Sequence, residues 1–113
     1  MTQMQQSTPT PPLRALTPAQ VAALPVDALA RSVVLDMTRS GRATVSLKRW
    51  ASGIRQAYRG HPQALRAISE SVAWLRHHMA LVDDLGVGLQ GDWITLSRHG
   101  AQWLQHGGAP GTP

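Results

Sequence analysis

The chain has 113 residues, enough for one small domain, and its eleven basic residues outnumber six acidic ones to give a net charge of +5. The absence of cysteine excludes disulfides, thiolate metal sites and thiol nucleophiles. No apolar run reaches the roughly 18 residues of a membrane span, and the N-terminus lacks the layout of a signal peptide. We therefore expect a soluble, cytoplasmic protein without a membrane segment.

The two ends of the chain have the composition of tails. Residues 1–16 are rich in Gln, Thr and Pro, and residues 107–113 are mostly small residues and Pro, so we expect both to be disordered. One domain is then expected at residues 17–106. Thr17-Pro18 favours a helix start, with a capping hydroxyl before Pro in the first helical position, and Pro25 ends this short turn.

A first long helix is expected over residues 27–41. Asp27 is placed to cap it, Leu29, Val33 and Met37 form one apolar stripe, and Gly41 is placed to end it. The β-favouring residues 43–45 that follow predict a short strand.

A second helix is expected over residues 46–59, with Ser46 as its cap. Its apolar residues fall on one face and its basic residues on the other. Gly53 inside this helix should cost roughly 1 kcal/mol relative to Ala, which a close helix crossing would explain. Gly60-His61-Pro62 then breaks the helix, and Pro62 suits the first position of the next one.

A third helix is predicted over residues 62–82, because apolar residues recur there at steps of three and four. Residues 85–96 change to the pattern of two short strands around a Gly-Asp turn. Ser97 is placed to cap a closing helix over residues 98–105.

This order of elements, with the phrase Ile94-Thr-Leu-Ser-x-x-Gly-x-x-Trp-Leu104, resembles the winged helix-turn-helix superfamily. The resemblance covers residues 27–105 and implies a mainly α fold with a small β-hairpin: a three-helix core, a wing and a short C-terminal helix. It also implies binding of double-stranded DNA, with the third helix in the major groove and the wing beside the backbone. Members that bind only proteins exist, so the resemblance alone does not decide the function.

The charge distribution favours the DNA-binding interpretation. Between Met37 and Val82 the only acid is Glu70, whereas basic residues recur throughout. A GC-rich genome would also enrich Arg codons without any functional reason. The residues expected to contact DNA, as phosphate anchors or from the first turns of the third helix, are Arg42, Lys48, Arg49, Arg55, Arg59, Gln63, Arg66 and Glu70.

The wing departs from the pattern of a DNA-contacting wing. Its expected tip carries Gln90, Gly91 and Asp92 in place of Arg or Lys, and Asp83 and Asp84 stand at its base, where they would repel phosphates. The alternative is therefore a winged helix module that binds a protein partner through the wing and the C-terminal helix. Its interface residues would be Trp74, His78 and Trp103.

Nothing in the sequence predicts an enzyme, a cofactor or a metal site. His77 and His78 are adjacent on a helix and point about 100° apart, so they cannot chelate one ion as a pair four residues apart would. The long apolar stripe that continues from Val72 to Val82 exceeds what one hairpin can cover, which predicts a homodimer.

Overall fold

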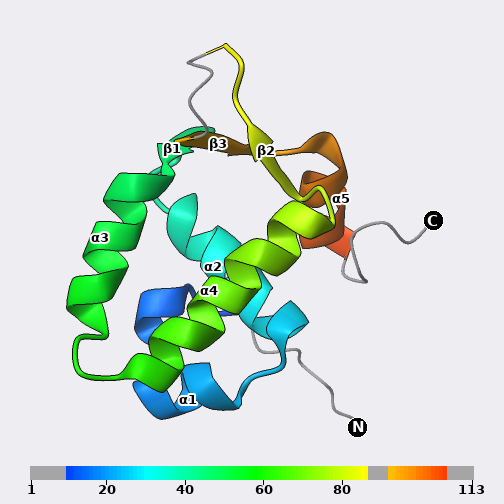
Figure 1. Ribbon diagram of the computed structural model, residues 1–113. Coiled ribbons are helices and arrows are strands. Elements are labelled where there is room, and N and C mark those ends of the chain that lie inside the picture. The colour runs from blue at the N-terminus through cyan, green and yellow to red at the C-terminus, as the bar shows by residue number, and fades with distance from the viewer. Residues whose placement is uncertain (1–9, 87–91, 107–113) are drawn as a thin grey trace, which may run out of the picture.

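The computed structural model describes residues 10–86 and 92–106, so most of both expected tails and the wing tip, with Gln90 and Gly91, lie outside the described residues. The described chain is mainly helical, with a small antiparallel sheet at one end (Figure 1). Its elements, in chain order, are η1 (Leu13–Ala15), α1 (Pro18–Ala23), α2 (Val26–Met37), β1 (Thr44–Ser46), α3 (Leu47–Ala57), α4 (Pro62–His77), β2 (Leu81–Asp83), β3 (Trp93–Leu96) and α5 (Arg98–His106).

The sheet has the strand order β1-β3-β2, and both pairings are antiparallel. Val45 lies opposite Ile94, and Val82 lies opposite Thr95. The short strand expected before the second helix is thus confirmed. Of the two strands expected within residues 85–96, β3 lies there, whereas the first, β2, lies earlier in the chain, because the helix before it ends at His77. This layout is compatible with that of a winged helix.

The end of the third helix was predicted wrongly. α4 ends at His77, and Val82, expected on its apolar stripe, belongs to β2. The helix closes with a Schellman motif, in which the Ala80 N–H donates to the Leu75 carbonyl at 2.8 Å and the Met79 N–H donates to that of Arg76 at 3.1 Å. This motif requires a left-handed residue, and Met79 takes that conformation with φ 61°. Because Met79 occupies a position where Gly is usual, the end of the helix could not be recognised from the sequence.

The start of α2 also differs from expectation. Pro25 occupies the N-cap position without a side-chain cap, and Asp27 lies within the first turn. There its carboxylate still suits the positive end of the helix dipole. The helix ends at Met37, and Gly41, with φ 81°, lies in the turn beyond it.

The other predicted helix starts are confirmed. Thr17 and Gln20 form a reciprocal capping box at α1. The Ser46 hydroxyl accepts the Arg49 N–H at 3.3 Å, and the Ser97 hydroxyl accepts the Gly100 N–H at 2.8 Å. These caps fix where α1, α3 and α5 leave the preceding chain.

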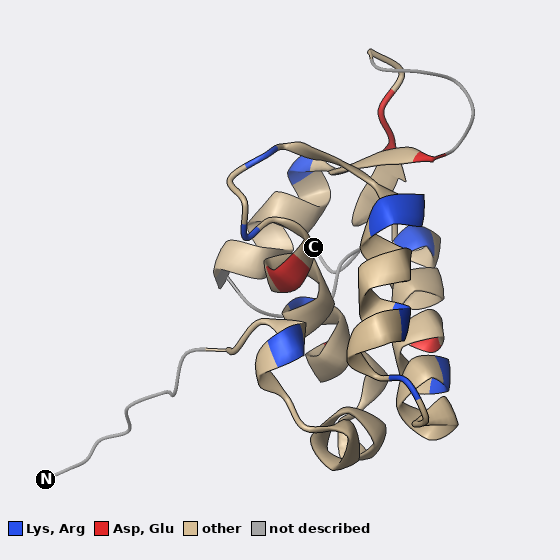
Figure 2. Ribbon diagram, turned by 90° about the vertical axis from the view of Figure 1, so that its left-hand side faces the viewer, with Lys and Arg blue, Asp and Glu red and all other residues tan. Residues whose placement is uncertain are grey.

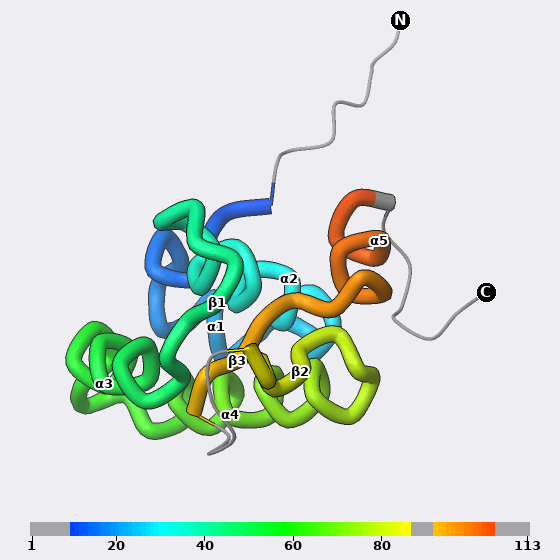
Figure 3. Tube along the Cα trace, turned by 90° about the horizontal axis from the view of Figure 1, so that it is seen from above, coloured from blue at the N-terminus to red at the C-terminus, as the bar shows by residue number. Residues whose placement is uncertain are grey.

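The core lies between α2 and α4, with α3 and α5 at opposite sides of this pair, as Figures 1 and 3 both show. Leu29, Val33 and Leu75 are fully or almost fully buried there, and Ile94 brings the sheet onto the same core. α5 approaches the end of α4 so closely that a Cβ at Gly100 would lie 2.5 Å from the Ala80 carbonyl oxygen. Gly is therefore needed at this contact.

The segment before α1 was assigned to a tail, but residues 13–16 belong to the folded structure. Leu13 is 0% exposed, and its carbonyl oxygen lies 2.7 Å from the Tyr58 hydroxyl, which also lies 2.9 Å from that of Leu16. The phenol has one proton and donates it to one carbonyl at a time. This short segment therefore fastens the C-terminal end of α3.

A buried carboxylate joins three elements at the same place. The side chain of Asp36 is 0% exposed and accepts the Trp50 indole N–H at 2.8 Å and the Arg14 backbone N–H at 3.2 Å. The Arg14 guanidinium adds an ion pair at 3.2 Å and packs on α3, since a Cβ at Gly53 would lie 3.1 Å from it. Gly53 therefore accommodates a side chain from η1 and not the helix crossing expected from the sequence.

None of the described helices is long and apolar enough to cross a membrane.

Candidate nucleic-acid interface

The basic residues of α3 point in two directions. Lys48 and Arg55 are seven residues apart, so they lie nearly above one another on the helix. Arg49 follows Lys48 by one residue and is therefore turned about 100° away. Arg49 lines a hollow of about 390 Å³ together with Arg42 and the β1 strand. Of the expected phosphate anchors, the structure thus pairs Lys48 with Arg55 and Arg42 with Arg49.

Arg59 does not share a helical turn with Arg55, contrary to expectation. α3 ends at Ala57, and Arg59 lies in the turn before Gly60, which has φ 84°. Arg59 is exposed there, close in sequence to the start of α4. It remains near the turn that connects α3 with α4, although its direction is set by that turn and not by the helix.

The outward face of α4 carries the residues expected to read DNA bases. Gln63, Arg66 and Glu70 follow one another at steps of three and four, and all three are exposed. Ala73 and His77 continue the same exposed stripe to the end of the helix. This face lies opposite the buried residues of α4, so among the described residues it is a solvent-facing helical surface.

All eight residues expected to contact DNA are exposed. Within residues 10–86 and 92–106, none of the basic residues in this set forms an ion pair, because the ion pairs present use Arg14, Arg39 and Arg76. Figure 2 shows basic segments along the two helices at the right of the view, with α3 in front and α4 beside it. No ion pair within the described part of the protein therefore neutralises their charges, although the Asp92 carboxylate lies near enough to Lys48 and Arg49 to attract both.

The acids at the base of the wing have partners inside the protein. Asp83 pairs with Arg76 at 3.2 Å, and Asp84 accepts a short hydrogen bond from the Thr44 hydroxyl and another from the Gly86 N–H at 2.9 Å. The first contact joins the wing to α4, and the second joins it to β1. The Arg76 guanidinium thus offsets part of the charge of Asp83, whereas the donors to Asp84 are neutral groups that orient its carboxylate and leave its charge in place.

Asp92, expected at the wing tip, lies against the start of α3. Its carboxylate accepts the Ser46 hydroxyl at 2.8 Å and the Lys48 backbone N–H at 2.8 Å. The Lys48 N–H bond, followed by that of Ser46, holds the pKa of the Asp92 carboxyl below its usual 3.8. The carboxylate is a helix-terminal cap and ties the start of β3 to the N-terminus of α3.

The three residues expected to bind a protein partner form one internal cluster. The rings of Trp74 and His78 lie 4.3 Å apart, and those of Trp74 and Trp103 lie 5.7 Å apart. Trp103 is only 5% exposed, and Arg31 lies over its ring while donating to the carbonyls of Trp103 and Leu104. The cluster thus packs α5 onto α4 and α2, so Trp103 is a core residue.

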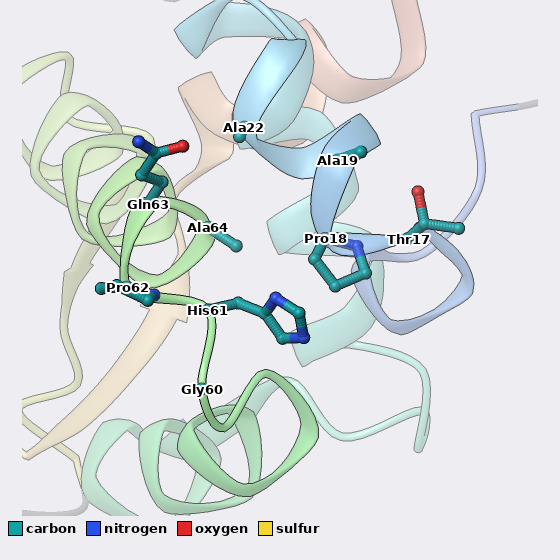
Figure 4. A pocket seen from close by; sticks show the side chains of 9 residues that line it. All are labelled: Thr17, Pro18, Ala19, Ala22, Gly60, His61, Pro62, Gln63 and Ala64. Carbon is teal, nitrogen blue, oxygen red and sulfur yellow. The ribbon is translucent and has the colours of Figure 1, made fainter.

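A hollow of about 530 Å³ lies between α1 and the start of α4 (Figure 4). Most of its walls are Pro and Ala side chains, and its polar side chains are those of Thr17, His61 and Gln63. The Thr17 hydroxyl is already used in the cap of α1. The described residues also contain no group of three or more His, Asp or Glu that could hold a metal ion.

Sequence reasoning missed the role of Asp36. The available signal was an acid on the buried face of a helix, next to the stripe of Leu29, Val33 and Met37. Such an acid requires hydrogen-bond donors, and the only Tyr and the Trp of α3 are natural candidates.

Comparison of the chain with protein-family models, with curated proteins and with solved structures found no match.

Proposed function

We propose that this chain is a winged helix protein that binds double-stranded DNA, with the outward face of α4 in the major groove. The observation that carries the proposal is the set of six exposed basic residues on and around α3 and α4, none of them in an ion pair within the described chain. Unpaired Arg and Lys on a helical surface attract a polyanion and release its counterions.

The residues divide by position into two roles. Lys48, Arg55 and Arg59 flank α4 from the second helix and the turn, where side chains meet phosphates in helix-turn-helix complexes. Arg42 and Arg49 border the sheet and supply a second group of phosphate contacts. The proposed base readers are Gln63, Arg66 and Glu70, all on the exposed stripe of α4.

The partnered acids of the wing strengthen this proposal relative to a module that binds protein. Each described wing acid has a hydrogen-bond donor or a cation within the domain, so these acids are explained by contacts inside the domain and do not require a basic protein partner. The burial of Trp103 weakens the alternative, since the expected interface loses one of its residues to the core.

The homodimer stays a prediction, but less of the apolar stripe on which it was based is available for pairing. Of the stripe that predicted it, Leu75 is buried within one chain, whereas Met79 and Val82 lie beyond the end of α4 and no longer continue a helical face. Sedimentation at tens of micromolar would test it, and a monomer would argue against a palindromic DNA site.

The decisive experiment measures binding to random and to selected duplex DNA as a function of salt. Arg55→Ala with Arg59→Ala should weaken both kinds of binding together and lower the salt slope by about one unit for each phosphate anchor removed. Arg98→Ala is the control, because Arg98 is an exposed arginine on α5, away from this surface. If the double variant binds as tightly as wild type at every salt concentration, α3 does not face DNA.

Arg66→Ala separates base reading from phosphate binding. Removal of a base-reading side chain should cost about 1–3 kcal/mol at one position of a selected site and relax the preference there. Affinity for random duplex should fall much less, apart from the small effect of one charge. An equal decrease in affinity for every DNA sequence would indicate that Arg66 contacts phosphate and does not read a base.

A further inference from the structure

A second surface lies beside the proposed DNA interface, in the groove between α3 and α4. The groove has a volume of about 380 Å³. Its apolar walls are Leu47, Trp50, Ala51 and Ile54 from α3 and Leu65, Ile68 and Val72 from α4. Ligand pockets for small molecules have volumes of about 300–1,000 Å³ and mostly apolar walls, so this groove is of the right size and character.

The groove stays open because α3 is held from its other side. The Trp50 indole donates to Asp36 of α2, and the Tyr58 hydroxyl is bound to carbonyls of the segment before α1. Leu47, Ala51 and Val72 consequently remain half-exposed at the groove although their residue types favour burial. A ligand that covers these side chains gains apolar contacts that the fold itself leaves unmade.

Among the described residues, the rim of the groove has one positive group and no acid. Arg55 and Ser69 are the charged and hydroxyl side chains that line it. The Ser69 hydroxyl donates its proton to the Leu65 carbonyl at 3.1 Å, so it has none to offer an anion. Arg55 is exposed and forms no ion pair within the described residues. Its planar guanidinium fits a carboxylate through two parallel hydrogen bonds.

We propose that the groove between α3 and α4 binds a small carboxylic acid with an aliphatic or phenyl tail, the tail lying along Ala51, Leu65 and Val72 and the carboxylate held by Arg55. A cationic rim and an apolar floor select this class over neutral and cationic ligands. The site goes beyond the proposed function and does not depend on it.

Charge also argues against a second copy of the chain as the occupant. A two-fold pairing of identical grooves would place two Arg55 guanidinium groups in one interface with no acid lining either groove, and unpaired like charges at an interface are unfavourable. The two large hydrophobic side chains most exposed in the described structure, Met79 and Leu85, lie outside the groove. A protein partner would therefore find no broad apolar surface around it.

Occupation of the groove would also affect DNA binding, because Arg55 belongs to the proposed phosphate anchors. The bound carboxylate would neutralise Arg55 and lower duplex affinity, as a small-molecule effector does. This regulatory consequence rests on the proposed function, whereas ligand binding to the free protein does not.

The test is calorimetric titration of the full chain, without DNA, with octanoate and with 4-phenylbutanoate. 1-Octanol serves as the uncharged comparison for octanoate. Arg55→Gln should weaken carboxylate binding by about tenfold or more, the effect of removing hydrogen bonds to a charged group, and leave octanol binding unchanged. Arg98→Gln removes an equal charge from α5 and should leave both unchanged.

A second variant tests the apolar part of the site. Ala51→Phe fills the groove and should abolish binding of both acids, while urea unfolding verifies that the variant is folded. Binding of neither acid at millimolar concentration, or equal binding by wild type and by a folded Ala51→Phe variant, overturns the proposal. Equal binding of octanoate by Arg55→Gln and wild type also overturns it. If both acids bind as expected but the protein does not bind duplex DNA, only the proposed function is refuted.

Discussion

Replacement of Asp36 by Ala should destabilise the domain more than any surface substitution. The carboxylate accepts the Trp50 indole N–H at 2.8 Å and the Arg14 backbone N–H at 3.2 Å in a site closed to water. Each hydrogen bond to a charged acceptor contributes about 1.5–3 kcal/mol, so the two together contribute about 3–6 kcal/mol. The ion pair with the Arg14 guanidinium adds little, because that side chain is 37% exposed.

Urea unfolding followed by circular dichroism measures this destabilisation directly. Total stability of small domains is about 5–15 kcal/mol, so Asp36→Ala should move the midpoint far toward zero denaturant. Asp36→Asn keeps the shape and one acceptor oxygen and should destabilise the domain about half as much. The control is Asp83→Ala, which removes the exposed pair with Arg76 and should cost less than about 1 kcal/mol. Equal destabilisation by Asp36→Ala and Asp83→Ala would refute the assignment of Asp36 as a structural hub.

Three further predictions concern single residues. Burial, followed by the nearby Asp36, raises the pKa of Tyr58 above 10.0, so the folded state keeps the proton longer. The contribution of Tyr58 to stability should therefore be constant below pH 10 and fall above it, and Tyr58→Phe should abolish that fall in urea titrations. Asp92, with its pKa below 3.8, should stabilise the fold above about pH 4 and lose this contribution as pH falls further, a dependence that Asp92→Asn should reduce. Met79→Gly should raise the unfolding free energy by about 0.5–1 kcal/mol, because Gly takes φ 61° without strain; a decrease would contradict this.

The helix starts could be predicted from the sequence because their causes are local. Thr17, Ser46 and Ser97 each satisfy a backbone donor three residues along the chain, so the pattern is complete within one turn. The exposure of the basic residues within α3 and α4 followed in the same way from helical periodicity. The end of α4 could not be predicted, because Met79 adopts a left-handed conformation for which its residue type gives no sign.

The contacts that the sequence could not reveal all join residues distant along the chain. Asp36 and Trp50 are fourteen residues apart, and Ser46 and Asp92 are forty-six apart, so no window of the sequence shows either pair. The groove beside Arg55 depends on them too, since α3 stands off α4 only because its other face is fixed to α2 and to residues 13–16. Long-range contacts thus decided the shape of the candidate sites, although local pattern supplied their residues.

Asp92 shows how such contacts change a functional conclusion, because its role in the structure differs from the role inferred from its position in the sequence. From the sequence alone, a carboxylate at the expected wing tip argued against DNA binding, because it would repel phosphate. In the structure it accepts hydrogen bonds from Ser46 and Lys48 at the start of α3 and anchors the wing there. In the proposed complex, a wing anchored at the N-terminus of α3 would approach DNA together with Lys48, which is exposed at the start of that helix. The same residue that opposed the DNA-binding interpretation therefore helps to position the surface on which that interpretation depends.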